Sequence, residues 1–475
     1  MLSLLLYRII LAYSSPIKEA LELSEINLTN LFILLGIFIA TYALIVWKNF
    51  DKNMAASLGA LASLIIGNAI GVFTQEEFLT VELAHDYVIL AVLFGNLLIV
   101  AVASEVGIFQ FISVFLLKVT RGDPKKLYYT LAGLTFLLSA VVNTIPAILV
   151  VGALTIVATQ ELGYDPKPYI LMEIVVTNTG GLTTVISAIT NLIIAAPFKI
   201  GFLQFIVIGA PLAIILLAVS IFMMIRIVPI PKISGEELEE KQLQIAGYNE
   251  WNVVKDVRKF KLTGAVFAIT MLLLLLSDNV GMDISVIAVG GGIIMVYTSG
   301  YTFEKILPKV DWTLLGFFTS LFVLIKGLEL VGLLDLLSNF LVYVMDQWLN
   351  GNSILSALLI LLFSSAFSGV LDNVVLAVAL TPILEKIAVS NPALHIGGMV
   401  WALIIGTNLG GGLTPIGAPP VVLGLGILYR ETGSKVGWGE FFKKVGMVTL
   451  VRIFISAIYV IFLVLLFSSN SLINL

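Results

Sequence analysis

Amide and hydroxyl side chains stand beside runs of glycine at two points of this chain, each in the middle of a long apolar stretch. The first point is Thr177-Asn178-Thr179-Gly180-Gly181, and the second is Thr407-Asn408-Leu409-Gly410-Gly411-Gly412. Oxygen atoms of such side chains and of free backbone carbonyls suit a small hard cation. Glycines let backbone N–H groups approach an oxygen-bearing solute closely. The two points therefore predict a binding site for a solute and for an ion that accompanies it.

A purely structural role is the alternative, because Asn and Thr side chains also hold membrane helices together through hydrogen bonds. For a single Asn that is the simpler interpretation. Here the set occurs twice, and the glycines, with Thr414 and Pro415 in the second copy, indicate that both helices are broken in mid-span. A broken helix inside a membrane must line a cavity, since its freed backbone groups cannot face lipid. We therefore favour a site.

Two further apolar stretches, 127–160 and 353–388, are interrupted at mid-length by the polar pairs Asn143-Thr144 and Asp372-Asn373. Each stretch is long enough to enter a membrane and turn back, which predicts two re-entrant hairpins with these pairs at their tips. Asp372 is the one acid at a predicted tip or break. Because a carboxyl inside a membrane is costly, Asp372 is predicted to bind a proton or help to hold sodium. The alternative is a structural cap on a half-helix.

The full candidate set for solute binding combines both tips and both breaks: Asn143, Thr144, Thr177, Asn178, Thr179, Gly181, Thr184, Asp372, Asn373, Thr407, Asn408, Gly411 and Thr414. Within this set a sodium ion is expected at Asn143, Asn178, Asp372 and Asn408. No cofactor is expected apart from that coupling ion.

The composition indicates the class of protein that must position these residues. The chain has 475 residues, of which 59% are hydrophobic and 12% charged, and its mean hydropathy is +1.08. Apolar runs of about 20 residues, each long enough to span the hydrocarbon core, recur along the chain. We therefore predict an all-α polytopic membrane protein that is not an enzyme. The absence of cysteine excludes thiol catalysis, and no nucleotide-binding or nucleic-acid-binding motif is present.

Ten apolar segments are predicted to cross the membrane besides the two hairpins, at 29–47, 54–73, 87–117, 169–197, 203–229, 262–277, 284–299, 312–345, 396–428 and 445–469. Alternate loops carry most of the 26 Lys and Arg residues. The positive-inside rule places those loops in the cytoplasm. The linker 230–261 is then cytoplasmic and the C-terminus lies outside. The linker is either a solvated connector, which we favour, or a loop that binds a regulatory partner.

Four landmarks recur in the same order about 225–230 positions apart: Asp86 and Asp311, Gly107 and Gly332, Ser139 and Ser368, Thr177 and Thr407. They predict two repeats, 29–229 and 262–475, which follow an N-terminal segment, 1–28, and are joined by the linker 230–261. Whether residues 1–13 form a further span is left open. Each repeat has five crossings, an odd number, so the second is inverted relative to the first. Inverted repeats are the architecture of alternating access.

Other charged residues fall inside predicted spans, and four of them bear on the interpretation. Lys326 and Glu329 are three positions apart on one helix and are expected to pair. Glu173 either gates a path or extends its carboxyl toward the membrane surface, and Arg452 is expected to extend toward the inner surface in the same way.

The broken helices and hairpin tips of this sequence resemble those of the ion transporter superfamily. That group includes arsenite permeases, the P protein and its relatives, one class of sodium/proton antiporters and the divalent anion/sodium symporters. The run from Gly406 to Ala418 is similar to the second broken helix of that group, and Ser368-Gly369-Val370-Leu371-Asp372-Asn373 is similar to its Asp-Asn hairpin tip. Gly437-Trp438-Gly439-Glu440-Phe441-Phe442-Lys443 resembles the lead-in to its last span. The resemblance covers about 29 to 469. It implies a homodimer in which a mobile transport domain moves against a static scaffold.

One departure bears on the branch. Arsenite permeases and antiporters tend to carry Asp-Asn at the first tip as well, whereas this chain has Asn143-Thr144, closer to the Ser-Asn-Thr motif of the anion symporters. The leading interpretation is a secondary active transporter of a small anion or metalloid oxyacid, coupled to sodium or protons, in the plasma membrane of a prokaryote. One alternative is a sodium/proton antiporter, which is disfavoured because the hairpin tips carry one acid instead of two. The other is a membrane subunit that works with a soluble ATPase. The complete repeats disfavour that subunit because they already supply alternating access.

Overall fold

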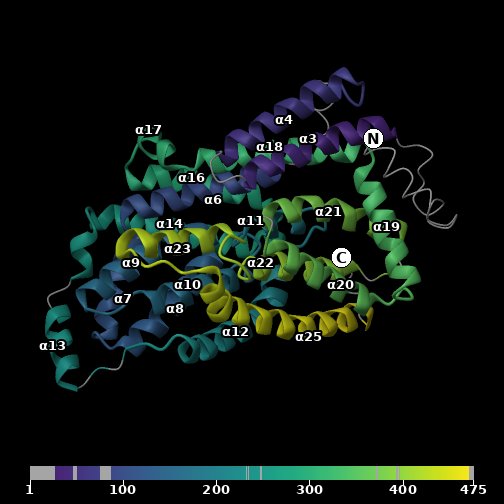
Figure 1. The fold of residues 1–475 in the computed structure, drawn as a ribbon. Helices are drawn as coiled ribbons and strands as arrows, with labels where there is room; N and C mark the ends of the chain where they lie inside the picture. Colours follow the sequence, from purple (N-terminus) through teal and green to yellow (C-terminus); the bar gives the residue numbers. More distant parts are fainter. Residues whose placement is uncertain are drawn as a thin grey trace.

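The structure is a computed structural model that describes residues 27–46, 51–74, 87–231, 233, 235–246, 249–370, 373–391, 394 and 396–469. Within these ranges every regular element is a helix, and the helices form an elongated bundle (Figure 1). Asp86, Asp372 and the two ends of the chain lie outside the described residues. The predictions that rest on them are therefore untested.

Two pairs of helices are each separated by one or two residues that include a glycine in a left-handed conformation. The first pair is α6 (Tyr87–Val106) and α7 (Ile108–Thr120), which meet at Gly107, where φ is 90°. The second is α18 (Trp312–Leu330) and α19 (Leu333–Gln347), which meet next to Gly332, where φ is 80°. Only glycine adopts such angles without steric cost. The spans predicted as continuous at 87–117 and 312–345 are therefore both interrupted.

The two predicted hairpins are pairs of consecutive helices. The first consists of α8 (Pro124–Val141) and α9 (Thr144–Glu161), and the second of α20 (Ser353–Ser368) and α21 (Asn373–Ser390). Asn143 caps α9, because its side-chain oxygen accepts a hydrogen bond from the backbone N–H of Ile145. The first turn therefore falls at the predicted polar tip.

Both predicted broken helices are broken in the structure. The first runs as α10 (Lys167–Gly180), an irregular segment over 181–188, and α11 (Ile189–Ala195). The second runs as α22 (Ile396–Gly410), an irregular segment over 411–418, and α23 (Pro419–Thr432). We call these two irregular segments the first break and the second break. The glycines that end α10 and α22, and the prolines at the start of α23, account for their positions.

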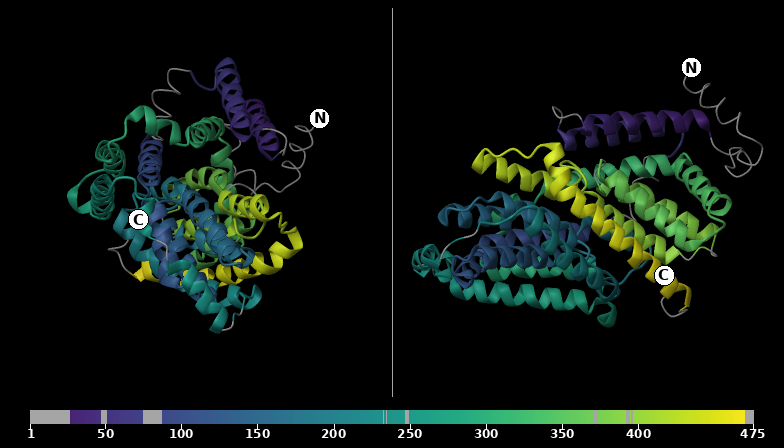
Figure 2. Two further views of the ribbon diagram at one scale, coloured as in Figure 1. Left: turned by 90° about the vertical axis from the view of Figure 1, so that its left-hand side faces the viewer. Right: turned by 60° about the horizontal axis from the view of Figure 1, so that its bottom comes forward.

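The remaining helices complete the bundle and its connections. They are α3 (Leu28–Val46), α4 (Lys52–Ala69), α12 (Phe202–Ile227), α13 (Gly235–Ala246), η3 (Glu250–Val253), α14 (Val257–Leu275), α15 (Ser277–Val280), α16 (Ile284–Ser299), α17 (Phe303–Ile306), η4 (Leu307–Lys309), α24 (Trp438–Phe441), the π-helical η5 (Phe442–Gly446) and α25 (Met447–Ser469). Helices α3 and α4 pack against each other and α18, at one edge of the bundle (Figure 2).

The hairpins and the broken helices pack in a reciprocal pattern. Helix α8 packs on α10 within the first half, and α20 packs on α22 within the second. The other arms cross over, since α9 packs on α23 and α21 packs on α11. Each hairpin therefore contacts the broken helices of both halves.

The linker and the neighbouring connections gather at one end of the bundle. Helices α13 and α17 lie at that end, and the connection between α19 and α20 lies at the opposite end (Figure 1). In the linker, Glu250 accepts a hydrogen bond of 3.1 Å from Lys118 at the end of α7. A hydrogen bond to its own backbone and the one from Lys118 lower the pKa of Glu250.

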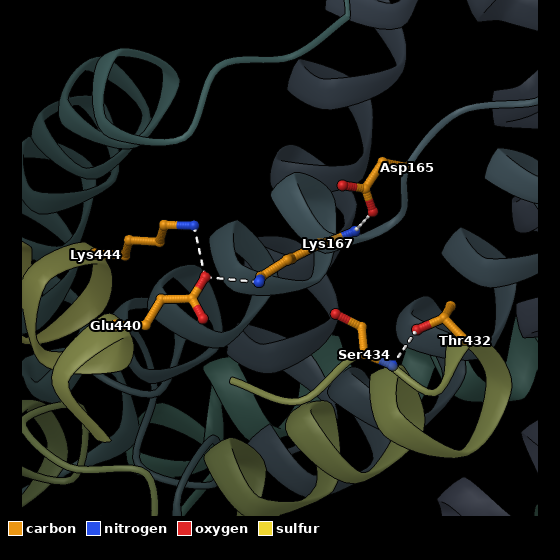
Figure 3. Close-up of polar contacts among 6 residues, drawn as sticks. All are labelled: Asp165, Lys167, Thr432, Ser434, Glu440 and Lys444. Carbon is orange, nitrogen blue, oxygen red and sulfur yellow. Dashed lines mark hydrogen bonds and ion pairs between the residues drawn. The ribbon is translucent and has the colours of Figure 1, made fainter. Parts of the chain in front are cut away.

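A shared carboxylate joins the two halves near the start of α10. Glu440 of α24 lies 2.6 Å from Lys167 and 2.8 Å from Lys444, as Figure 3 shows. Asp165 accepts a hydrogen bond of 2.9 Å from the backbone N–H of Lys167. These contacts tie the beginning of α10 to the segment that leads into α25.

Seven helices of the described chain are long and apolar enough to cross a membrane, and an eighth span arises if α16 and the segment bent by 105° after it are counted together. The protein is thus an integral membrane protein. Among the seven are α9 and α21, the second arms of the hairpins. The broken helices are too short to qualify piece by piece, so the predicted division into ten crossings and two re-entrant hairpins remains a prediction.

Candidate functional site

The end of α22, which leads into the second break, and the first hairpin tip both meet the first break at Gly181. A methyl group added at Gly181 would lie 3.0 Å from the side-chain oxygen of Asn408 and 3.0 Å from Cγ2 of Thr144. Three elements that are far apart in sequence therefore converge on one backbone position, and a larger residue there would fill the space between them. Gly181, Asn408 and Thr144 were all predicted site residues.

An amide pair links the two broken helices directly. The side-chain N–H group of Asn408 donates hydrogen bonds of 2.7 Å to the side-chain oxygen of Asn191 and 2.8 Å to the carbonyl of Ile404. Asn191 in turn donates to the carbonyls of Gly181, at 2.6 Å, and Thr184, at 2.9 Å. Asn191 was not in the candidate set, yet together with the hydroxyl of Ser187 it satisfies the two carbonyls that the first break frees from the helix.

Side chains of the first break also hold the hairpin tip. Thr184 donates a hydrogen bond of 2.6 Å to the carbonyl of Ala140, and the carbonyl of Ser187 accepts one of 3.1 Å from the backbone N–H of Thr144. The hydroxyl of Ser187 bonds back to the carbonyl of Gly181 at 2.7 Å. The predicted residues Thr144, Gly181 and Thr184 thus belong to one hydrogen-bonded unit.

The second break is bound to its hairpin in a similar way. Ser368 at the end of α20 donates a hydrogen bond of 2.7 Å to the carbonyl of Thr407, and Thr414 donates to the carbonyl of Gly369. Gly411 packs against the end of the same segment, because a methyl group there would lie 2.5 Å from Cβ of Ala418.

Three of the predicted hydroxyls bond to their own helices. Thr177 donates to the carbonyl of Glu173 at 2.7 Å, Thr179 to that of Val175 at 3.0 Å, and Thr407 to that of Leu403 at 2.8 Å. Such bonds satisfy the hydroxyl without a ligand. The structure therefore assigns these three threonines a weaker part in any site than the asparagines beside them.

Three buried amide atoms have no hydrogen-bond partner within the described residues: Nδ2 of Asn178, Oδ1 of Asn373 and Oδ1 of Asn96. A buried polar atom without a partner is costly and is a natural contact for a ligand, an ion or water. Asn178 and Asn373 were predicted site residues, one at the end of α10 and one at the start of α21.

Asn96 is a residue that the sequence analysis missed. It lies on α6, is buried, and donates to the carbonyl of Val142 at 2.8 Å and to that of Ile186 at 3.3 Å. Asn96 thus clamps the first hairpin tip to the first break. The available signal was a lone amide in the middle of an otherwise apolar span, which is rarely without purpose in a membrane.

The prediction for Arg452 was wrong. Its side chain does not extend to the membrane surface; it is fully buried on α25 and donates a hydrogen bond of 2.7 Å to the hydroxyl of Thr179. Its Nε and Nη1 atoms have no partner in the part of the chain that the structure describes. One turn earlier, Thr449 donates to the carbonyl of Gly412 at 3.3 Å. The inward face of α25 therefore contacts both broken helices.

One cavity reaches this region, and a second lies beside α11. One, of about 390 Å³, extends from Glu105 and Lys309 to Asn96 and Asn143. Glu105 is in contact with Lys309 and also lies 3.4 Å from Lys305 and 3.9 Å from Lys255. The mouth of this cavity is therefore charged. The other cavity, of about 560 Å³, is lined by α6, α11, α18 and α21. It contains the predicted pair Lys326 and Glu329, whose charged atoms are 3.0 Å apart.

Comparison with known proteins decides the family of this bundle. The profile of CitMHS, described as citrate transporter, matches residues 42–406. The chain belongs to the CitMHS family. This is a family of transporters rather than enzymes, and the predicted resemblance to the P protein and its relatives is confirmed.

Individual relatives of this CitMHS protein are distant but extend over most of it. It is 28% identical to the uncharacterized transporter Rv2684 of Mycobacterium tuberculosis over 425 residues, which cover 89% of this chain and 96% of that protein. It is 25% identical to the P protein of Mus musculus, with coverage of 86% and 57%. The YdaH transporter of Alcanivorax borkumensis shares the fold, with a TM-score of 0.54 at 15% identity, over 86% of this chain and 97% of that one.

Proposed function

We propose that this protein is a secondary active transporter of a small anion or metalloid oxyacid, coupled to sodium or protons, with its site between the two breaks. The observation that carries this proposal is the convergence of Asn408 and Thr144 on Gly181. Two broken helices from the two halves of one chain, with amides and backbone groups beside each break, are the expected form of a transporter's binding site.

We further propose that 29–229 and 262–475 are inverted repeats joined by the linker 230–261. The reciprocal packing of α9 on α23 and of α21 on α11 supports this. So does the matched packing of hairpins on broken helices: a methyl group at Gly180 would lie 2.6 Å from Cβ of Ser139, and one at Gly410 would lie 2.8 Å from Cβ of Ser368. A two-fold relation between halves accounts for both observations.

The two cavities support alternating access as the mechanism. The smaller cavity is lined by α6, the start of α9 and the start of α18. The larger one is lined mainly by α18 and α21, with the start of α6. Under the proposed repeats α6 corresponds to α18, and α9 corresponds to α21. Each cavity is therefore lined by the counterparts of the helices that line the other, so the cavities are two access paths to one site. We propose that the linker side is cytoplasmic, and that the protein forms a homodimer in a bacterial plasma membrane.

Citrate is the first solute to test, because the family is described by it. An anion fits the hydrogen-bond donors of this region, including the unpartnered amide N–H group of Asn178 and the guanidinium of Arg452. Sodium remains proposed at Asn143, Asn178, Asp372 and Asn408.

The test is uptake by purified protein in liposomes. Labelled citrate is offered first, followed by other small carboxylates and by arsenite, with the sodium and pH gradients imposed separately. We expect concentrative uptake of at least one solute under one of the gradients, and none in empty liposomes. Failure of every solute under both gradients contradicts the proposal. Sodium-driven proton movement without any solute in the same liposomes supports the sodium/proton antiporter instead.

A further inference from the structure

Glu173 is a carboxyl buried away from the site described above. It lies on α10, one turn before Thr177, and its side chain has no exposed surface. One of its oxygens, Oε1, accepts a hydrogen bond from the hydroxyl of Thr155 on α9. The other, Oε2, has no partner among the described residues.

Close apolar packing seals this carboxyl. A methyl group added at Gly152 of α9 would lie 3.1 Å from Cδ1 of Ile427 and 3.8 Å from Oε2 of Glu173. One added at Gly424 of α23 would lie 2.7 Å from Cγ1 of Ile174. Glu173 therefore sits where α9, α10 and α23 come together, and no solvent reaches it in this arrangement.

No cation balances Glu173 within the residues that the structure describes. Several charged groups on the elements packed against α10 are exposed: Lys125 and Lys126 on α8, Glu161 on α9, Arg430 and Glu431 on α23, and Lys443 on η5. The others have partners of their own: Lys444 of η5 is paired with Glu440, Arg452 of α25 is bonded to Thr179, and Arg226 of α12 lies over Phe222. On α8 the buried group is Tyr128, whose hydroxyl has no partner among the described atoms. Helix α22 carries no charged residue.

An ionised carboxylate in such a place is far costlier than a neutral carboxylic acid with one hydrogen bond. We propose that Glu173 is a proton-binding site: it holds a proton in this closed arrangement and exchanges it with water when α9 and α23 separate from α10. One proton is taken up by the carboxylate on one side of the membrane and released on the other. This inference rests on the proposed function, because it adds a proton to the transport cycle.

Infrared spectroscopy of the purified protein in lipid tests the bound proton without any solute. We expect the C=O band of a neutral carboxylic acid near neutral pH in the wild type, and a loss of intensity in Glu173→Gln. Gln has the same shape and keeps an acceptor for Thr155. Glu329→Gln removes a carboxylate that is paired with Lys326, so it should leave the band unchanged. Thr155→Val should shift the band without removing it. An identical band in Glu173→Gln overturns the proposal.

Proton movement then tests its role in transport. A pH-sensitive dye is trapped in the liposomes, and the solute found above, with citrate as the first probe, is supplied at a series of pH values. In Glu173→Gln we expect solute exchange to survive while proton movement is lost and the pH dependence of uptake becomes flat. A merely structural Glu173 predicts a less stable variant with the wild-type pH profile, which overturns the proposal. If Glu173→Gln loses the infrared band as expected but the wild type transports no solute, the proposed function is contradicted and the proton-binding site is not.

Discussion

The side-chain amide of Asn408 donates a 2.7 Å hydrogen bond to the side-chain oxygen of Asn191, 217 positions away in the chain. This bond joins the helix that enters the second break to the helix that leaves the first. A movement of either broken helix therefore strains or breaks a contact of the other, which is the property that a shared site between two halves requires.

Asn408→Ala should reduce initial uptake about tenfold or more, because loss of a buried hydrogen bond and an unpaired partner cost about 1–3 kcal/mol. Asn191→Ala should have an effect of similar size. If the two residues act as one unit, the fold reduction of the uptake rate in the double variant should be much smaller than the product of the two single fold reductions. Uptake rates of all four proteins in liposomes check this, with the exposed Asn279→Ala as a control. Independent, multiplying effects would contradict the link.

Crowding at Gly181 gives a second prediction. Neither Gly181 nor Gly411 has a positive φ, so space rather than backbone angle makes glycine necessary there. Gly181→Ala should lower uptake strongly and Gly181→Leu or Gly411→Leu should abolish it, while the proteins still insert into the membrane. Gly133→Ala on α8 is the matched control, because a methyl group there meets nothing within 4 Å. Normal uptake by Gly181→Leu would show that no ligand path passes this point.

Asn96 should matter for stability as well as for uptake. Asn96→Ala removes both bonds that clamp the first tip to the first break, at an expected cost of about 1–3 kcal/mol. The midpoint of thermal unfolding in detergent should fall by several degrees relative to Asn68→Ala, a change at an exposed position of α4. An unchanged midpoint would mean that the clamp is dispensable.

Arg452 allows stability and function to be separated. A buried charge that has no ionic partner among the described residues carries a large desolvation cost, which an apolar side chain of similar volume avoids. Arg452→Met should therefore leave the unfolding midpoint unchanged or raise it, yet reduce anion uptake about tenfold through the lost charge and hydrogen bond. Arg452→Lys should retain part of the activity. A lower midpoint with unaltered uptake would assign Arg452 to packing alone.

The orientation can be measured because the chain lacks cysteine. We expect a cysteine at Lys241, on α13 of the linker, to react with an impermeant reagent only after the cells are permeabilised. A cysteine at Leu475 should react in intact cells. Labelling of position 241 from outside would reverse the proposed topology.

The sequence predicted the breaks and the hairpins well because their causes are local. Glycine, proline and polar pairs interrupt an apolar stretch, and the interruption has few structural solutions in lipid. The sequence does not predict the interruptions at Gly107 and Gly332, since a glycine in an apolar run is also compatible with a continuous helix. Whether it takes a left-handed conformation depends on how the next helix packs.

Long-range contacts explain the misses. A single arginine in the last span suits a side chain that reaches the membrane surface, and nothing local indicates that α25 turns Arg452 toward Thr179. The same holds for Asn96, whose partners are two backbone carbonyls of other elements. Which face of a helix turns inward is a property of the assembled bundle.

The inward face of α25 also bears on biogenesis. Thr449 and Arg452 contact Gly412 and Thr179, yet α25 is synthesised after every other helix of the site. A nascent chain that has inserted only as far as η5 holds both broken helices without these partners. Assembly of the site must therefore wait until α25 has left the translocon, and chains stalled before Met447 should be recognised and degraded as unfinished.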